Sequence, residues 1–371
     1  MKKQESKPFD FILFITIIVL LAMGIIMVLS ASSPSALAED GNSYSYVTKQ
    51  ATFAALGFIC MIIISKIDYR VYAKFYKIIY IVVIVMLAIV PIIGHNAKGA
   101  TRWLNLGFVT FQPSELAKIG LIIFYATWLT KNKDNLKTQS KGFWVPILYF
   151  VPVALILVLL QDHLSATVVI ALIIGVMMLM AGSQIKYFLT YGVAGVSAAG
   201  IGLYLLAKLT GTGAFRLERI TAFLNPWADP TDTGWQIIQS LYAIGSGGLF
   251  GVGLGESKQK FLYIPEPHND FIFAVLAEEL GFIGCAAIIL LFTIFIWRGL
   301  VIAMKAPDMF GSLVAVGITA LVGIQAIINI AVVTSSMPNT GMPLPFFSYG
   351  GTALIILLCS VRNIVEYIEK L

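Results

Sequence analysis

The sequence predicts an all-α polytopic membrane protein with ten transmembrane helices. Of its 371 residues, 58% are hydrophobic and 12% are charged, which is about half the charged fraction of a typical soluble domain. Nearly unbroken apolar runs at 11–29 and 78–93 approach the roughly 20 residues that a helix needs to cross the hydrocarbon. These runs exclude a large soluble helical protein.

The apolar segments give the expected helices in order. We predict them at 10–31, 46–66, 76–93, 114–131, 143–160, 165–182, 187–207, 269–297, 310–332 and 349–366. Residues 1–371 are expected to form a single integral membrane domain. A large loop at 208–268 separates the seventh and eighth helices, and a loop of this length in a compact protein is usually functional or disordered. Its aromatic and aliphatic content argues against disorder.

Two features organise this loop. Residues 235–244 form an amphipathic piece, and a glycine-rich stretch follows at 245–255. The glycines match neither the dinucleotide-binding nor the P-loop spacing. Close backbone packing or a re-entrant turn is the interpretation that we favour for them.

The distribution of basic residues sets the orientation. Sixteen of the 25 lysines and arginines fall in the segments on one side of the ten helices, and Lys118 lies within a helix. Five of the eight on the other side belong to the loop at 208–268, and long loops are translocated largely regardless of charge. Both termini are therefore predicted to be cytoplasmic and the long loop extracytoplasmic. The net charge of +6 needs no nucleic-acid partner to explain it.

The three cysteines lie far apart inside apolar segments. Neither a CxxC nor an HExxH pattern is present, so we expect neither a disulfide framework nor a structural metal site.

The segment that is most costly to place at a membrane is YIPEPHNDFIFAVLAEELG at 263–281. This segment places a carboxylate, an imidazole and an amide at the start of an apolar helix, where placing polar and ionisable groups in the membrane costs free energy. Asp270 lies where the helix is expected to begin, so it could serve as an N-cap or carry chemistry. Further along the helix, Glu278 and Glu279 are expected to be buried, one of them paired with a cation such as Lys118 or an arginine.

Two further clusters supply cations. Glu115 and Lys118 share a helix face, either as an intrahelical ion pair that lets both enter lipid or as a functional pair. Arg216 and Arg219 are also three residues apart. They could offer two guanidinium groups to a phosphate or pyrophosphate, or lie on anionic headgroups as part of an amphipathic helix.

Five segments, in this order, resemble the SEDS family of bacterial shape, elongation, division and sporulation proteins over essentially the whole chain. They are QPSELAK at 112–118, AFLNPWADP at 222–230, GWQIIQSLYAIGSGGLFGVGLG at 234–255, SKQKFLYIPEPHNDFIFAVLAEELG at 257–281 and NTGMPLPFFSYGGT at 339–352. The 257–270 part looks more like the FtsW/SpoVE branch of the family than the RodA branch.

The resemblance implies a peptidoglycan glycosyltransferase of the bacterial cytoplasmic membrane that polymerises lipid II with a class B penicillin-binding protein. In that family the acidic residue at the position of Asp270 is regarded as essential for polymerisation. The positions of Arg216, Arg219, Glu115 and Lys118 belong to the family's polar cavity. The chain departs from the family's usual QPDLGT turn, because it reads Gln161-Asp162-His163-Leu164-Ser165-Ala166-Thr167. Either Asp162 or His163 could take the polar role there.

Asp270 is thus the candidate general base, since a carboxylate within reach of the acceptor hydroxyl can remove its proton. The candidate substrate-binding residues are Arg216, Arg219, Lys118, Glu115, His268, Asn269 and Glu279. The two arginines and Lys118 would hold the departing pyrophosphate. No protein metal ligands are predicted, and a divalent cation that bridges the pyrophosphate stays open as an alternative.

Two other functions fit the same residues. One is a lipid II transporter, or flippase, and the other is a non-catalytic scaffold for the penicillin-binding protein in which Asp270 only caps a helix. Transporters usually bind their substrate near the membrane midplane, whereas the strongest polar cluster here is expected at the outer surface. That placement favours the enzyme.

Overall fold

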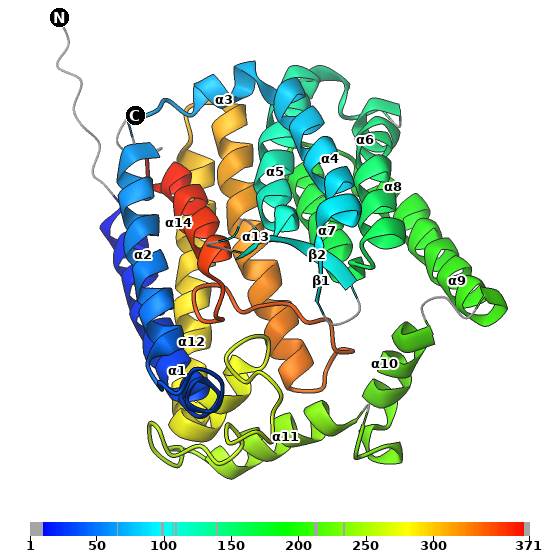
Figure 1. Ribbon diagram of the computed structural model, residues 1–371. Helices are drawn as coiled ribbons and strands as arrows, with labels where there is room; N and C mark the ends of the chain where they lie inside the picture. The colour runs from blue at the N-terminus through cyan, green and yellow to red at the C-terminus, as the bar shows by residue number, and fades with distance from the viewer. Residues whose placement is uncertain are drawn as a thin grey trace, which may run out of the picture.

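The computed structural model describes residues 10–64, 66–97, 100–105, 107, 110–138, 140–210, 214–232 and 234–366. The fold is a bundle of helices with one small sheet (Figure 1). Its helices are α1 (Phe11–Asp40), α2 (Ser45–Ile64), α3 (Arg70–Lys74), α4 (Tyr76–Ile93), α5 (Pro113–Lys131), η1 (Lys133–Asn135), η2 (Ser140–Trp144), α6 (Val145–Leu155), η3 (Ile156–Leu160), α7 (Leu164–Met180), α8 (Ile185–Tyr187), η4 (Phe188–Gly192), α9 (Val193–Thr210), α10 (Ala214–Leu224), η5 (Pro226–Ala228), α11 (Trp235–Gly247), α12 (Ile272–Lys305), α13 (Met309–Val333) and α14 (Gly351–Glu366).

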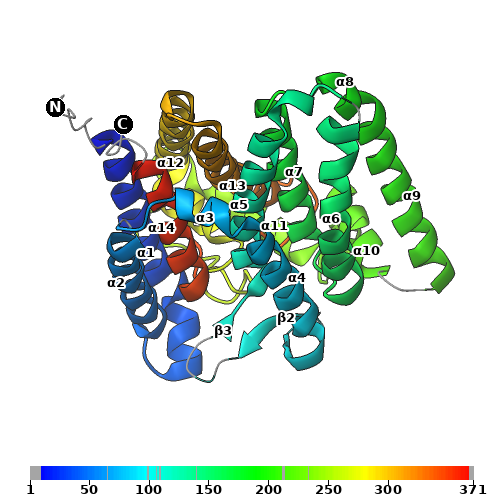
Figure 2. The ribbon, with the colours of Figure 1, turned by 90° about the horizontal axis from the view of Figure 1, so that it is seen from above.

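Helix α13 forms the centre of the bundle. It packs against α12, α5 and α7, and most of its apolar side chains are buried. Figure 2 shows α1, α2 and α14 on one side of the bundle and α6, α8 and α9 on the other. Helix α4 has only three buried residues and is otherwise apolar, as expected for a helix that faces lipid.

A helix overlaps each of the ten predicted ranges. Six helical segments in the described part of the chain are long and apolar enough to cross a membrane: 11–40, 45–64, 76–93, 142–160, 272–305 and 309–333. The predicted bounds of α4 agree with the structure, whereas α1 continues to Asp40 instead of ending near residue 31. Its last turns stay helical because small residues there pack inside the protein, with Ser32 and Ala36 fully buried.

The short sheet was not predicted. Its strands β1 (His95–Ala97), β2 (Ala100–Asn105) and β3 (Thr110–Phe111) are antiparallel in the order β1-β2-β3 and join α4 to α5. Strands of two to six residues leave little periodic signal in a sequence. Arg102 and Leu104 both belong to β2, whose pairing with β1 is irregular beside Arg102.

Ion pairs and hydrogen bonds mark the two ends of the bundle. At one end Arg298, near the end of α12, pairs with Asp10 at the start of α1. At the same end Asp308, which caps α13, accepts hydrogen bonds from Tyr69 and Arg70. The loops that precede α12 and α14 meet at the opposite end, where the candidate site lies.

Helix α12 is broken at Gly281, which has φ 66° and ψ −166°. A break frees backbone groups that a continuous helix would pair, and the glycine-rich segment 248–253 pairs them instead. Four hydrogen bonds of 2.9–3.1 Å join the segments: Val252 N to Glu278 O, Gly253 N to Glu279 O, Phe282 N to Gly248 O and Ile283 N to Leu249 O.

This contact explains the glycines. A Cβ on Gly251, whose φ is +80°, would lie 2.1 Å from the carbonyl oxygen of Glu279, and a Cβ on Gly281 would lie 2.3 Å from Gly251 N. Both positions combine positive φ with direct backbone contact, so only glycine fits them. The predicted close backbone packing of this stretch is confirmed.

Candidate active site

Asp270 lies in the turn before α12, not at its N-cap. The N-cap residue is Phe271, and no side chain there caps the helix. The helix begins at Ile272 rather than near 269, because residues 264–271 contain two prolines, Pro265 and Pro267, and form bends and turns. The N-cap interpretation of Asp270 is therefore wrong. Its carboxylate is half-buried.

Three consecutive carbonyl groups at Asp270 are each held by a donor from the C-terminal part of the chain. Tyr349 N donates to His268 O (2.9 Å), and Ser348 Oγ donates to Asn269 O (2.6 Å). Asn329 Nδ2 on α13 donates to Asp270 O (2.7 Å). We call these three hydrogen bonds the carbonyl clamp. The clamp fixes the backbone from which the carboxylate projects.

Aromatic packing supports the clamp. The buried ring of His268 lies between Tyr46 of α2 and Tyr349, with ring centroids 4.6 and 5.8 Å away. Gln50 of α2 donates to Ser348 O and accepts from Gly350 N. Asn269 Nδ2 donates to Glu266 Oε2 (2.8 Å). His268 and Asn269 therefore shape the turn.

The loop at 339–341 joins Asp270 to Arg219 and to the start of α7. A Cβ on Gly341 would lie 3.7 Å from Asp270 Oδ2, so the carboxylate faces this loop. Arg219 donates to Asn339 O (3.4 Å), and Ser165 Oγ donates to Thr340 O (2.6 Å). The side chain of Arg216 lies outside the described part of the chain.

A second group of cations lies around the start of α7. Lys118 Nζ is 2.8 Å from the carboxylate oxygens of Glu115, so the predicted ion pair is confirmed, and Lys118 is 1% exposed. Arg102 on β2 donates to the carbonyl groups of Gln161 and Asp162. The buried Lys118 and Arg102 thus flank the 161–163 turn.

His163 occupies this turn and precedes Ser165 by two residues. Burial, together with the positive charges of Arg102 and Lys118, lowers the pKa of His163 to about 3, so its ring is neutral at pH 7. Its buried Nδ1 has no hydrogen-bond partner among the described residues. The ring can therefore offer a hydrogen bond to a ligand, whereas Asp162 supplies its backbone carbonyl to Arg102.

Glu278 and Glu279 form a separate buried cluster. Glu279 pairs with Lys260 (2.9 Å) and accepts from Ser30 of α1 (2.6 Å). Glu278 accepts from Ser257 Oγ and from backbone N–H groups of the 257–259 loop. The predicted pairing of one glutamate with a cation is confirmed, but the suggested cations are wrong. Lys260, from the long loop, is the partner, and Lys118 is already paired with Glu115.

Sequence reasoning missed several residues of the site. Arg102, Ser165, Ser348, Gln50 and Asn329 were not among its candidate site residues. An isolated amide in a buried helix must find partners, so Asn329 carried a usable signal. In the described part of the chain no three histidine, cysteine, aspartate or glutamate side chains gather as metal ligands would.

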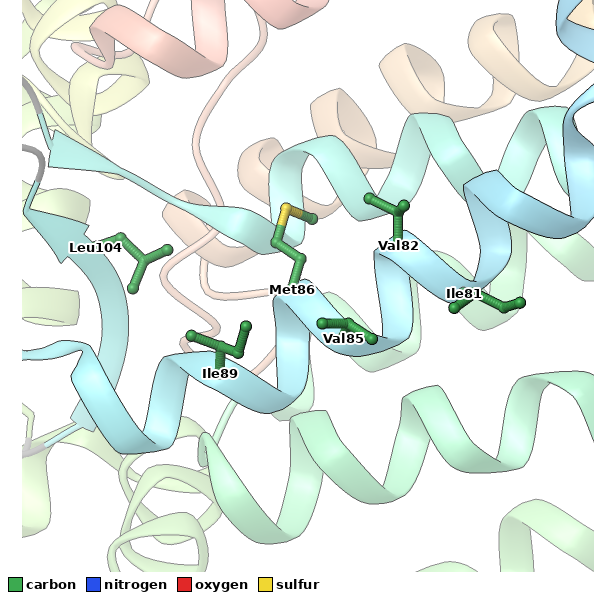
Figure 3. Close-up of a pocket in the computed structure, with 6 residues that line it drawn as sticks. All are labelled: Ile81, Val82, Val85, Met86, Ile89 and Leu104. Carbon is green, nitrogen blue, oxygen red and sulfur yellow. The ribbon is translucent and has the colours of Figure 1, made fainter.

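An apolar groove of about 300 Å³ lies beside the second cation group. Its lining residues come from one face of α4 and from β2 (Figure 3): Ile81, Val82, Val85, Met86, Ile89 and Leu104. Leu104 follows Arg102 by two residues on β2. The cationic group and the apolar groove are therefore neighbours along this strand.

Comparison with known proteins agrees with the resemblance seen in the sequence. The family model of FtsW, RodA and SpoVE, described as "Cell cycle protein", matches residues 11–370. The chain is 42% identical over 363 residues to "Stage V sporulation protein E" of Bacillus subtilis, with 97% of each chain covered. It is 42% identical over 360 residues to "Probable peptidoglycan glycosyltransferase FtsW" of a Geobacter species, with 96% of each covered.

Two solved structures share the fold. One, described as "Structural coordination of polymerization and crosslinking by a peptidoglycan synthase complex", superposes with a TM-score of 0.77 at 26% identity and 97% coverage of both chains. The rod shape determining protein RodA of Thermus thermophilus superposes with a TM-score of 0.70 at 25% identity, covering 97% of this chain and 96% of that one.

Proposed function

The chain belongs to the FtsW, RodA and SpoVE family, and from this membership we propose that it polymerises lipid II at the outer face of the bacterial cytoplasmic membrane. It is a peptidoglycan glycosyltransferase, as its FtsW relatives are named, and a bacterial membrane protein. The proposal of lipid II polymerisation rests on the carboxylate of Asp270, which is fixed by the carbonyl clamp and faces the 339–341 loop.

In the proposed reaction, Asp270 accepts the proton of the acceptor sugar hydroxyl. The hydroxyl oxygen then bonds to the anomeric carbon of the donor sugar with inversion, while the bond from that carbon to the pyrophosphate oxygen breaks. The electron pair leaves with the lipid pyrophosphate. Arg219, Arg216, Lys118 and Arg102 would stabilise this developing charge, since preorganised cations act strongly where water is excluded.

The same geometry suggests how the lipid is bound. We propose that the pyrophosphate lies near Arg102 and Lys118, with the His163 ring as a neutral hydrogen-bonding neighbour. The apolar groove along α4 would take the start of the prenyl chain (Figure 3). Glu115 is the ion-pair partner of the buried Lys118, and His268 and Asn269 position the base. Glu279 is instead proposed to support the loop, because its oxygens are engaged by Ser30 and Lys260.

We further propose that ten helices cross the membrane and that both termini are cytoplasmic. The end of the bundle with Asp10, Arg70 and Arg298 would then face the cytoplasm, in line with the excess of basic residues there. The long loop and Asp270 would face outward. A class B penicillin-binding protein is the proposed partner, because a solved relative of the same fold belongs to a peptidoglycan synthase complex.

Reconstitution separates this function from its alternatives. The purified protein, with and without its transpeptidase partner, is placed in vesicles that contain fluorescent lipid II, and the products are resolved by size. We expect glycan strands in the wild-type reaction. Movement of lipid II across the bilayer without strands would identify a transporter. Neither activity, despite a stable complex with the partner, would identify a scaffold.

The carbonyl clamp gives a second expectation. Asn329→Ala removes the donor to Asp270 O and leaves Met342 O without a bond from this side chain. We expect kcat to fall by up to about 10²-fold, because small displacements of a catalytic group are that costly, with little change in KM. Thr334→Ala, at the exposed end of the same helix, is the matched control. A rise in KM at unchanged kcat would contradict the positioning role.

A further inference from the structure

The loop before Asp270 exposes an unusual number of large apolar side chains. Phe250 is 80% exposed and Leu249 is 63% exposed, although they belong to a loop that the charge pattern places outside the membrane. Further exposed residues of this loop are Leu254, Phe261, Leu262 and Tyr263. Large exposed apolar side chains gathered in one loop are typical of a surface that lipid or another molecule covers.

The patch continues onto α12. Phe282 N and Ile283 N donate to Gly248 O and Leu249 O, so the loop lies directly against the helix just after its break. Phe282 and Ile283 are themselves 66% and 52% exposed. Helix α12 is a candidate membrane span, and the exposed residues of the loop therefore extend its lipid-facing surface.

The length of α12 sets the depth of the break. The ion pair of Arg298 with Asp10 marks where the helix leaves the hydrocarbon at the other end, because charged pairs are costly at the bilayer centre. From Gly281 to Arg298 the helix rises about 26 Å at 1.5 Å per residue. The hydrocarbon is about 30 Å thick. Measured from Arg298, it therefore extends at least to the level of the break at Gly281, and so to the level of Leu249 and Phe250.

The backbone of the segment is compatible with this depth. Irregular backbone is tolerated within a membrane only where its polar groups are paired inside the protein. Residues 248–253 exchange four hydrogen bonds with α12, and Gly251 N also donates to Gly247 O. The charged side chains of Glu256 and Lys258, further along the loop, are exposed and would reach the headgroups.

We propose that the tip of the glycine-rich loop, with Leu249 and Phe250, inserts into the acyl chains of the outer leaflet. The loop then anchors α12 at its break and fixes the depth of the turn that carries Asp270. If the proposed function holds, that depth brings the carboxylate to the level of the membrane surface, where the pyrophosphate of a lipid-linked sugar lies.

Depth measurements by spin labelling test the insertion. Cys60, Cys285 and Cys359 are replaced by alanine, and Phe250→Cys is spin-labelled in the full chain within phosphatidylethanolamine and phosphatidylglycerol vesicles. Collisions with oxygen, which concentrates in acyl chains, are compared with collisions with a water-soluble nickel chelate. Glu256→Cys, in the same loop, is the matched control. We expect several-fold lower nickel accessibility and higher oxygen accessibility at position 250 than at position 256.

Two outcomes would overturn the proposal. Equal nickel accessibility at both positions would place the loop in water. Shielding at position 250 that appears only after the transpeptidase partner is added would make the patch a protein interface instead. Leu249→Cys serves as a second reporter if the first variant does not fold, which gel filtration of the purified protein shows. Because these measurements use no lipid II, failure of the polymerisation assay leaves them unaffected.

Discussion

Replacing Asp270 by asparagine is expected to lower the rate of lipid II polymerisation by about 10²–10⁴-fold, the usual contribution of general base catalysis. Asparagine keeps the size and shape of the side chain but cannot accept the hydroxyl proton. The backbone there is held by Asn329, Ser348 and the Tyr349 N–H rather than by the carboxylate. The variant should therefore fold and bind substrate. Strand formation from fluorescent lipid II gives the rate.

Asp232→Asn is the matched control, because Asp232 is an exposed carboxylate in the same long loop. Its activity should equal that of the wild type, and Asp270→Ala should be as inactive as Asp270→Asn. Unchanged strand formation by Asp270→Asn, with the same thermal stability as the wild type, would remove Asp270 from the role of base. The membership of the family would stand in that case, since it does not depend on this residue.

The second large effect concerns stability. Lys260 and Glu279 are 3% and 1% exposed and form an ion pair of 2.9 Å. Lys260→Met leaves a buried carboxylate without its cation, which typically costs about 3–5 kcal/mol. We expect a much lower midpoint of thermal unfolding in detergent for this variant. The double variant with Glu279→Gln, which removes both charges, should recover most of the loss.

Lys258→Met provides the control for this series, because the Lys258 side chain is exposed in the same loop. It should unfold at the wild-type temperature. If Lys260→Met were as stable as Lys258→Met, or if the double variant were less stable than Lys260→Met, the pair would not hold the loop. Ser30→Ala should have a smaller effect, since it removes only one hydrogen bond to Glu279.

The sequence was informative wherever a property depends on local composition. The bounds of α4 could be read from its apolar run, and the Glu115–Lys118 pair followed from helical spacing. The break in α12 could not be predicted, because Gly281 looks like any helical glycine until the backbone of 248–253 is placed beside it. The partner of Glu279 was likewise hidden, since Lys260 belongs to a loop with no regular pattern.

In the candidate site, too, the residues in local motifs could be predicted and the contacts between distant residues could not. Asp270 and Arg219 were predicted from motifs, and the structure joins both to the 339–341 loop. The carbonyl clamp could not be predicted from the sequence, because Asn329 and Ser348 lie about 60 and 80 positions along the chain from the carbonyl groups that they hold. Two prolines move the start of α12 past Asp270, which local propensity for an aspartate N-cap does not reveal.

The carbonyl clamp also has a consequence for how the protein is made. Its three donors belong to α13 and to the loop before α14, which are synthesised after Asp270. Helix α14, the main packing partner of α2, follows both of them. A nascent chain therefore carries Asp270 before the donors of the clamp have been made, although Tyr46 of α2 is already present to pack against His268.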